Sequence, residues 1–157
     1  MHAPSLAEAL SRTDLARAER TCAEAGGKLT APRRDVLSLL LEADQPLAAY
    51  DLLARMQTLR GQTHPPTIYR ALDFLEQVGL VHRISSRKAY VACRNGSQSH
   101  RPVFLVCRVC KAATEVSLQG TDSLLADLAE GVGFECEQIV LEVQGRCRAC
   151  VEASSPT

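Results

Sequence analysis

Two C-x-x-C pairs constrain the fold of this chain more than any other feature. Cys107-Arg108-Val109-Cys110 and Cys147-Arg148-Ala149-Cys150 are separated by 36 residues. A C-x-x-C turn directs two thiolates toward one point, and tetrahedral zinc requires four such ligands. The separation exceeds the ~15–20 residues of a simple zinc ribbon, which leaves room for a helix and a strand. The sequence therefore predicts a structural zinc that closes a small sheet, bound by Cys107, Cys110, Cys147 and Cys150.

The remaining cysteine usage supports metal binding over disulfide formation. The chain has seven cysteines, an odd number, and its first residues lack the basic and apolar pattern of a secretory leader. Paired knuckles in a reducing compartment are typical of metal sites, so we expect a cytoplasmic protein. Cys22 and Cys136 lie in apolar contexts and are expected to be core residues.

Composition excludes several classes of protein. No apolar run approaches the ~20 residues that span a bilayer, so no membrane partner is expected. Aromatic residues make up only 4% of the 157 residues, with no Trp, which argues against a stacking platform for single-stranded nucleic acid. No Ser-His-Asp set, phosphate loop or pair of catalytic carboxylates is evident, so neither an enzyme nor a small organic substrate is expected.

The apolar periodicity of the first half predicts helices followed by two short strands. Helices are expected from about residues 6, 31, 48 and 66, and strands over 80–84 and 88–92. This order is that of a winged helix-turn-helix domain, assigned to residues 1–93. Residues 1–93 contain 12 Lys or Arg against 10 Asp or Glu, and the rest 6 against 8, so an anionic partner is expected at the first half.

The second half predicts a different architecture. Residues 94–101 are polar and rich in turn formers, so they are expected to form a hinge. Residues 102–157 are expected to form a small α+β domain, with strands over 103–106, 113–116 and 134–143 and a helix over 121–131. The complete chain is thus expected to have an α+β fold with two domains.

A second set of metal-ligand types lies around the hinge. His82, Cys93, His100 and Glu115 offer two imidazoles, one thiolate and one carboxylate, which suit tetrahedral zinc. A site with one thiolate should bind more weakly and exchange more readily than one with four. The alternative is that these are four ordinary residues of a strand, a core, a loop and a surface.

Several residues of the first half could contact DNA. Arg70, on the exposed side of the fourth helix, suits a bidentate contact to guanine, and Thr67 and Tyr69 lie beside it. Backbone positioning is expected of basic residues elsewhere, namely Arg33, Arg34, Arg83, Arg87 and Lys88. The alternatives are that Tyr69 packs in the core and that the arginines are solvated.

Four motifs of the first half resemble those of the ferric uptake regulator family. They are residues 29–34, 49–53, 65–75 and 79–83, which read LTAPRR, AYDLL, PPTIYRALDFL and GLVHR. Both C-x-x-C pairs and the spaced Cys93 and His100 also align with the family, so the resemblance covers about residues 15–151. Within the family, the chain is most similar to the zinc-responsive branch.

The resemblance implies a homodimeric winged-helix repressor that binds double-stranded operator DNA and dimerises through its C-terminal domain. It implies two zinc ions per chain, a structural one at the four cysteines and a regulatory one at His82, Cys93, His100 and Glu115. It also implies that Tyr50 contacts a base. Two alternatives stay open: a sibling regulator that responds to iron, manganese or peroxide, and a thiol redox switch. The thiolate of Cys93 favours zinc over iron or manganese.

Overall fold

The computed structural model describes residues 6–94, 102–116, 121–135 and 139–153. The chain divides into two compact units, residues 1–98 and 99–157, and each is described by itself. The expected hinge falls almost entirely outside the described residues, as does Cys136.

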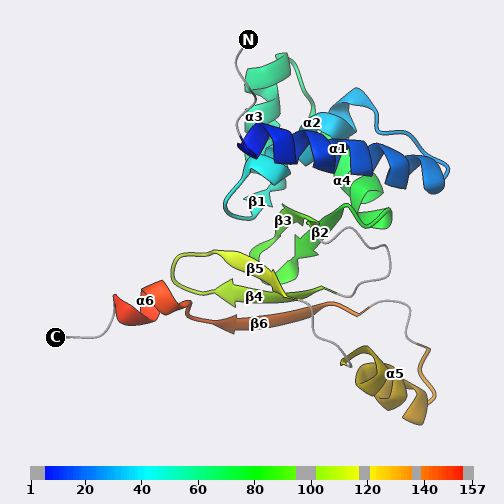
Figure 1. Ribbon diagram of the computed structural model, residues 1–157, viewed down its shortest axis with the longest axis vertical. Coiled ribbons are helices and arrows are strands. Elements are labelled where there is room, and N and C mark those ends of the chain that lie inside the picture. The colour runs from blue at the N-terminus through cyan, green and yellow to red at the C-terminus, as the bar shows by residue number, and fades with distance from the viewer. Residues whose placement is uncertain (1–5, 95–101, 117–120, 136–138, 154–157) are drawn as a thin grey trace. The chain divides into compact units, whose positions relative to one another are not determined.

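Four helices form most of the first unit (Figure 1). They are α1 (Leu6–Glu24), α2 (Ala31–Glu42), α3 (Ala49–Arg60) and α4 (Pro65–Gln77). Proline in the first turn of α2 and of α4 removes N–H groups that have no partner at a helix start. Gly61 and Gly79 follow α3 and α4 with φ of 75°, a conformation that glycine adopts without a steric penalty. The helices expected from the sequence are therefore confirmed.

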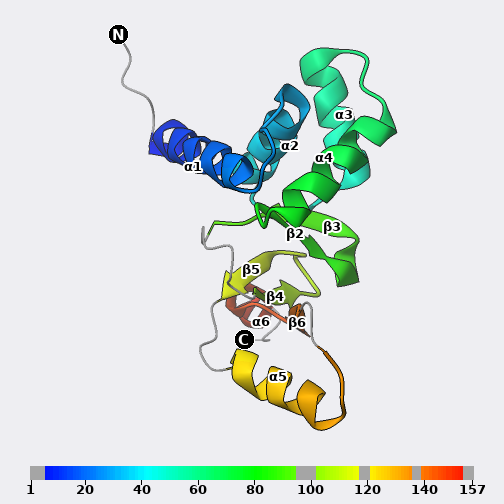
Figure 2. The ribbon, with the colours of Figure 1, turned by 90° about the vertical axis from the view of Figure 1, so that its right-hand side faces the viewer.

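The wing of the first unit is a sheet of three strands. β2 (Val81–Ile84) and β3 (Ala89–Ala92) are antiparallel neighbours joined by η1 (Ser85–Arg87), and β1 (Leu47–Ala48) pairs with the other edge of β3. The two strands expected here are confirmed, whereas β1 was not predicted because its two residues carry no periodic signal. Figure 2 shows α4 beside β2 and β3.

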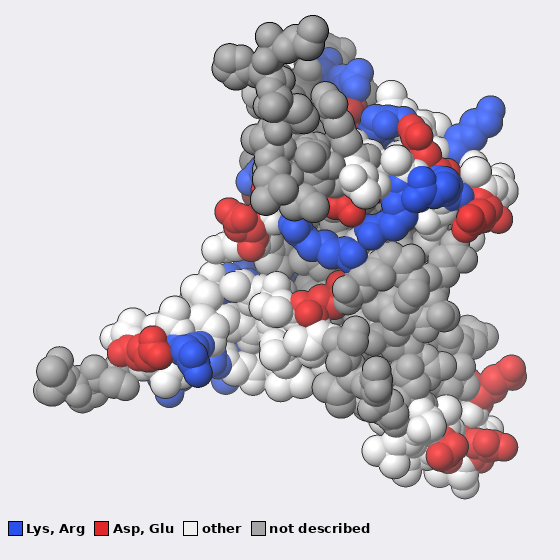
Figure 3. All heavy atoms as spheres, viewed as in Figure 1, with Lys and Arg blue, Asp and Glu red and all other residues white. Residues whose placement is uncertain are grey.

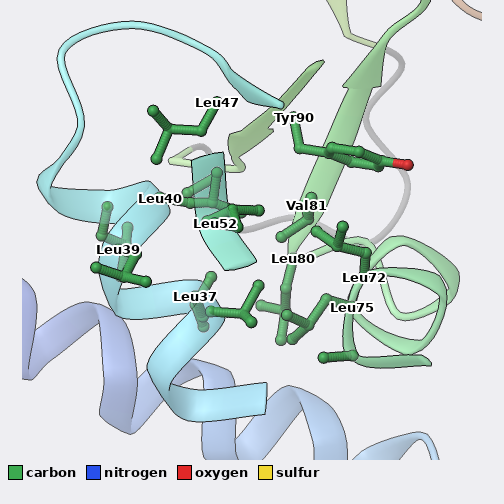
Figure 4. Close-up of a cluster of buried hydrophobic side chains, with 14 of the residues drawn as sticks. Leu37, Leu39, Leu40, Leu47, Leu52, Leu72, Leu75, Leu80, Val81 and Tyr90 are labelled. Atoms are coloured by element: carbon green, nitrogen blue, oxygen red, sulfur yellow. The ribbon is translucent and has the colours of Figure 1, made fainter. Parts of the chain in front are cut away.

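The core of the first unit lies between its helices and its wing (Figure 4). Leucines from α2, α3 and α4 converge there with Leu80 and Val81 at the start of β2. Cys22 of α1 is fully buried, which confirms its expected place in the core. The apolar stripes read from the sequence thus pack against one another, because each helix buries one face.

The second unit is built on a mixed sheet with the order β5-β4-β6. β4 (Val103–Cys107) pairs with β5 (Ala113–Val116) antiparallel and with β6 (Leu141–Gly145) parallel. Two helices accompany it, α5 (Thr121–Gly131) and α6 (Arg148–Glu152).

One expected strand of the second unit begins later than predicted. Phe134 donates its backbone N–H to Ala129 O at 2.8 Å, and Gly133 has a φ of 73°. Phe134 therefore completes the C-terminal cap of α5 instead of starting a strand. The strand expected over 134–143 was wrong at its start, since β6 begins at Leu141 and continues to Gly145.

Candidate metal centres and nucleic-acid interface

The parallel pairing of β4 and β6 brings the two C-x-x-C pairs together. Cys107 is the last residue of β4 and lies opposite Gly145, the last residue of β6. Both pairs therefore leave the sheet at the same end. Cys110 follows in a turn in which Lys111 has a φ of 70°, and Cys147 caps the start of α6.

The four sulfur atoms have the spacing of a tetrahedral metal site. The sulfurs of Cys107, Cys110, Cys147 and Cys150 all lie within 4.8 Å of one another. The sulfurs of Cys110 and Cys147 are 3.7 Å apart. Four thiolates around zinc, each bonded at about 2.3 Å, would be separated by about 3.8 Å. The residues therefore fit a zinc ion, and they would hold it through thiolates alone.

Backbone amides give the four-thiol cluster an uneven electrostatic environment. The backbone N–H groups of Cys147 and Cys110 lower the pKa of the Cys107 thiol to about 5. The pKa of Cys150 rises to about 12, mainly through its hydrogen bond with Cys147 and through burial. The Cys107 thiolate thus forms readily, whereas deprotonation of the other thiols requires a cation to offset the accumulating negative charge. A divalent metal ion supplies the positive charge.

Two residues of the second predicted ligand set lie together in the first unit. His82 is on β2, and Cys93 directly follows β3. The wing register places His82 opposite Val91, two residues before Cys93, so the side chains of His82 and Cys93 are diagonal neighbours on one face. Their ligand atoms lie within 4.8 Å of each other, which is close enough for both to bind one ion. Cys93 is buried and donates its backbone N–H to Leu80 O at 2.8 Å.

The other two predicted ligands belong to the rest of the chain. Glu115 is on β5 of the second unit, opposite Phe104 in the register of β4. His100 lies outside the described residues.

Most of the residues of α3 and α4 that were predicted to contact DNA are exposed. Tyr50 is in the first turn of α3 and is 78% exposed, and Tyr69 of α4 is 53% exposed. Arg70 is also exposed, and Thr67 is partly buried. Ile68, Ala71 and Leu72 pack in the core, so the helical period turns Tyr69 and Arg70 outward.

Two of the arginines predicted to contact the DNA backbone also bind within the fold. The guanidinium carbon of Arg33 lies 3.3 Å from the centroid of the Phe74 ring, and Nη1 donates to Lys28 O at 2.6 Å. Arg34 forms a salt bridge with Glu19 of α1. On the wing, Arg87 is partly buried and Lys88 is exposed with a φ of 48°. Figure 3 shows a run of Lys and Arg side chains across the visible face of the first unit.

Sequence patterns did not identify Arg17 as a neighbour of the predicted ligand Cys93. Its guanidinium donates to the carbonyl oxygens of Cys93 and Arg94. These partners are 76 and 77 residues away along the chain, so no local spacing reveals the contact.

The match to a family model decides the classification. The model of the ferric uptake regulator family matches residues 24–144. The chain belongs to the ferric uptake regulator family. The resemblance noted in the sequence is thereby confirmed.

Individual relatives indicate which branch of the family the chain is more similar to. The zinc uptake regulation protein of Escherichia coli is 39% identical over 142 residues, which cover 90% of this chain and 83% of the relative. The ferric uptake regulation protein of Klebsiella pneumoniae is 27% identical over 139 residues, covering 85% of this chain and 88% of the relative. The greater similarity is thus to a zinc uptake regulator, as the motifs indicated.

Solved structures give the same result for the fold. A zinc uptake regulator complexed with zinc and DNA matches with a TM-score of 0.86 and 38% identity, covering 91% of this chain and 96% of that chain. Holo XcZur matches with a TM-score of 0.82 and 39% identity, over 90% and 99% of the two chains. The expected fold, a winged-helix unit followed by a small α+β unit, is confirmed.

Among the helices described, none combines the length and the apolar character needed to cross a membrane.

Proposed function

We propose that the chain is a zinc-responsive, DNA-binding transcriptional repressor of zinc uptake genes. The observation that carries the proposal is its similarity, over nearly its whole length, to a zinc uptake regulator complexed with zinc and DNA. The exposed Tyr50, Tyr69 and Arg70 support the DNA-binding part. The protein is expected to act in the cytoplasm, where its partner is double-stranded operator DNA. The helix α4 is expected to enter the major groove of that DNA.

The proposed metal sites have different roles because their charges differ. Four thiolates around Zn²⁺ give a net charge of about −2, which favours permanent, structural binding. His82, Cys93, His100 and Glu115 around Zn²⁺ would be about neutral, which favours reversible binding. The proximity of His82 and Cys93 supports the second site. Each chain would bind two zinc ions.

The proposed mechanism is a population shift. Residues 94–101 connect the units in sequence, and the proposed regulatory ligands precede this hinge (His82 and Cys93), lie within it (His100) and follow it (Glu115). Zinc at these ligands would restrict the hinge and favour the arrangement that binds the operator. The recognition helices of a dimer would then match major grooves about 34 Å apart. Zinc and DNA affinities would be reciprocally coupled.

Exposed apolar side chains support a homodimer formed through residues 102–157. Leu124, Leu128 and Phe134 are 60%, 61% and 66% exposed, and Val143 of β6 is also exposed. Leu124 and Leu128 lie one turn apart on α5, and large contiguous apolar patches on a protein surface are typical of interaction sites. A second copy of the chain would cover them.

Zinc content and DNA binding, measured together on the full chain, test the proposal. We expect two zinc ions per chain, one of which a mild chelator removes with loss of operator binding. His82→Ala and Cys93→Ser should lose the removable zinc and the zinc response but keep a folded dimer. His64→Ala is the matched control, because His64 is an exposed histidine. Zinc-dependent, tight operator binding by Cys93→Ser would contradict the regulatory assignment.

The two alternative functions predict different results. A regulator of iron or manganese uptake, or of the peroxide response, would bind DNA with those metals or oxidants and would not respond to zinc. A thiol redox switch would form reversible disulfides between the C-x-x-C pairs in place of bound zinc. Competition between zinc and iron(II), followed by mass measurement after alkylation, separates these outcomes.

A further inference from the structure

The segment that carries Cys93 is hydrogen-bonded to two helices of the first unit, α1 and α2. Arg17 of α1 donates from Nη2 to Cys93 O at 3.0 Å and from Nη1 to Arg94 O at 3.2 Å. Asp14, one turn earlier, contacts the same guanidinium at 3.3 Å. Arg94 in turn donates to Leu41 O in the last turn of α2 at 2.8 Å. Two successive residues are thus fastened just before residues 95–101.

The backbone of Cys93 is therefore bonded on both sides. Its N–H donates to Leu80 O at 2.8 Å, and its C=O accepts from Arg17 at 3.0 Å. With both peptide groups restrained, the direction of the Cα–Cβ bond is defined. That direction places the thiol within 4.8 Å of a ring nitrogen of His82.

We propose that Arg17 is a positioning residue for the metal ligand Cys93. The proposal rests on the regulatory role assigned to Cys93 above. Arg17 orders the backbone before metal arrives, so that the thiolate and the imidazole of His82 are already close. A ligand pair arranged in advance loses less conformational entropy on binding, and the zinc affinity of the regulatory site is correspondingly higher.

The chemistry of the guanidinium explains why arginine suits this position. Its planar fork can donate to two acceptors at once, and two neighbouring carbonyl oxygens lie within reach. An ammonium group carries its three N–H donors on one nitrogen atom, so lysine lacks the two separate nitrogens that here reach Cys93 O and Arg94 O. Ala18, the next residue, is fully buried in the core, which anchors the helix that presents Arg17.

The test compares Arg17→Gln, Arg17→Lys and Arg20→Gln in the full chain. Arg20 is an exposed arginine on the same helix, so its substitution removes the same charge. Zn²⁺ would be titrated against a competing chelator, with the four-cysteine site as an internal reference. Amide hydrogen exchange at Cys93 and Arg94, measured before the second zinc is added, reports the order of the segment.

Arg17→Gln should weaken binding of the second zinc about tenfold, the effect of losing charge-assisted hydrogen bonds. Binding of the first zinc should be unchanged, and DNA affinity at saturating zinc should be within about twofold of the original. The two amides should exchange faster. Arg17→Lys should retain part of the affinity, and Arg20→Gln should behave as the unsubstituted chain.

Two results would overturn the proposal. One is a second-site zinc affinity in Arg17→Gln equal to that of the unsubstituted chain. The other is an equal loss in Arg17→Gln and Arg20→Gln, which would be a general effect of charge. Cys93→Ser distinguishes the underlying function: if it loses the second zinc while Arg17→Gln keeps it, only the positioning role fails. If Cys93→Ser keeps the second zinc, the regulatory assignment fails, and the positioning role with it.

Discussion

At the scale of single residues, two basic side chains that were predicted to contact DNA also bind partners within the first unit. Arg33 contacts the face of Phe74 and the carbonyl of Lys28, and Arg34 is paired with Glu19. Arg33 and Arg34 remain predicted DNA contacts, but each has a structural role that charge alone did not indicate. Their substitution therefore needs a measurement of stability beside any measurement of DNA binding.

Arg33→Gln should lower the free energy of unfolding of the first unit by about 1–2 kcal/mol. The change removes a cation–π contact and one hydrogen bond to a backbone carbonyl. Urea denaturation followed by circular dichroism measures the effect. Arg55→Gln, an exposed arginine of α3, is the control and should change stability by less than about 0.5 kcal/mol. Equal stability of Arg33→Gln and the original chain would contradict the role of the Phe74 contact.

Glu76→Gln should stabilise the first unit at neutral pH but not at acid pH. Burial raises the pKa of Glu76, Arg83 partly offsets this, and Asp73 adds to it. A carboxyl whose pKa is raised on folding stabilises the fold below its unfolded pKa, and that contribution is lost as pH rises through the folded pKa. The gain should stay below about 1 kcal/mol, because the carboxylate is only partly buried.

Unfolding curves of Glu76→Gln at pH values on both sides of the ordinary glutamate pKa measure this effect. Glu24→Gln, at an exposed carboxylate of α1, is the control for charge removal. A stability difference that is the same at every pH would show that ionisation of Glu76 is not its source.

At the scale of elements, α4 combines packing and recognition in one helix. Ile68, Leu72 and Leu75 are buried in the core, and Tyr69 and Arg70 face outward. Because the helical period separates these two sets, substitutions on the outer face can change DNA binding without changing the core. The wing adds β1 and β2 on the two edges of β3.

Arg70→Ala should reduce affinity for the operator by about 1–3 kcal/mol, which is the usual contribution of one bidentate base contact. Affinity for unrelated DNA should fall less, because a phosphate contact is not the main loss. Fluorescence anisotropy with both duplexes measures the two affinities at one salt concentration. Arg146→Ala, an exposed arginine of the second unit, should leave both unchanged. An equal loss on both duplexes would assign Arg70 to the DNA backbone.

At the scale of the whole molecule, the two units bury their side chains in different ways. The first unit has a core of buried side chains from four helices and a sheet. Among the described residues of the second unit, buried side chains are concentrated on β4, and the four-cysteine cluster joins the ends of β4 and β6. Zinc there would close a long loop and would contribute directly to folding.

Cys107→Ser should remove the structural zinc and the cooperative unfolding of the second unit while the first unit still unfolds cooperatively. The reason is that one thiolate fewer leaves the ion three ligands, in a unit whose folding is coupled to metal binding. Calorimetry together with zinc analysis measures both effects. Cys93→Ser is the control, because it should keep the structural zinc. Full zinc content in Cys107→Ser would contradict the assignment.

The sequence by itself determined the helices, their buried faces and the four cysteines that fit a metal ion. These features follow from local spacing: the helical period separates the two faces of α4, and a C-x-x-C turn brings two sulfurs together within four residues. The resemblance to the ferric uptake regulator family added DNA as the expected partner of the outer face of α4. Where local patterns were ambiguous, as at Phe134, the start of a strand and the cap of a helix could not be distinguished.

Only the tertiary structure decided the contacts between distant segments. The parallel pairing of β4 with β6 unites the two C-x-x-C pairs, and Arg17 contacts the carbonyl of Cys93 from 76 residues away. An added Cβ at Gly27 would lie 2.7 Å from Phe74 Cζ, so any side chain there would have to displace the Phe74 ring. Such contacts depend on how complete elements pack, and packing is a property of the whole fold that no local window of sequence contains.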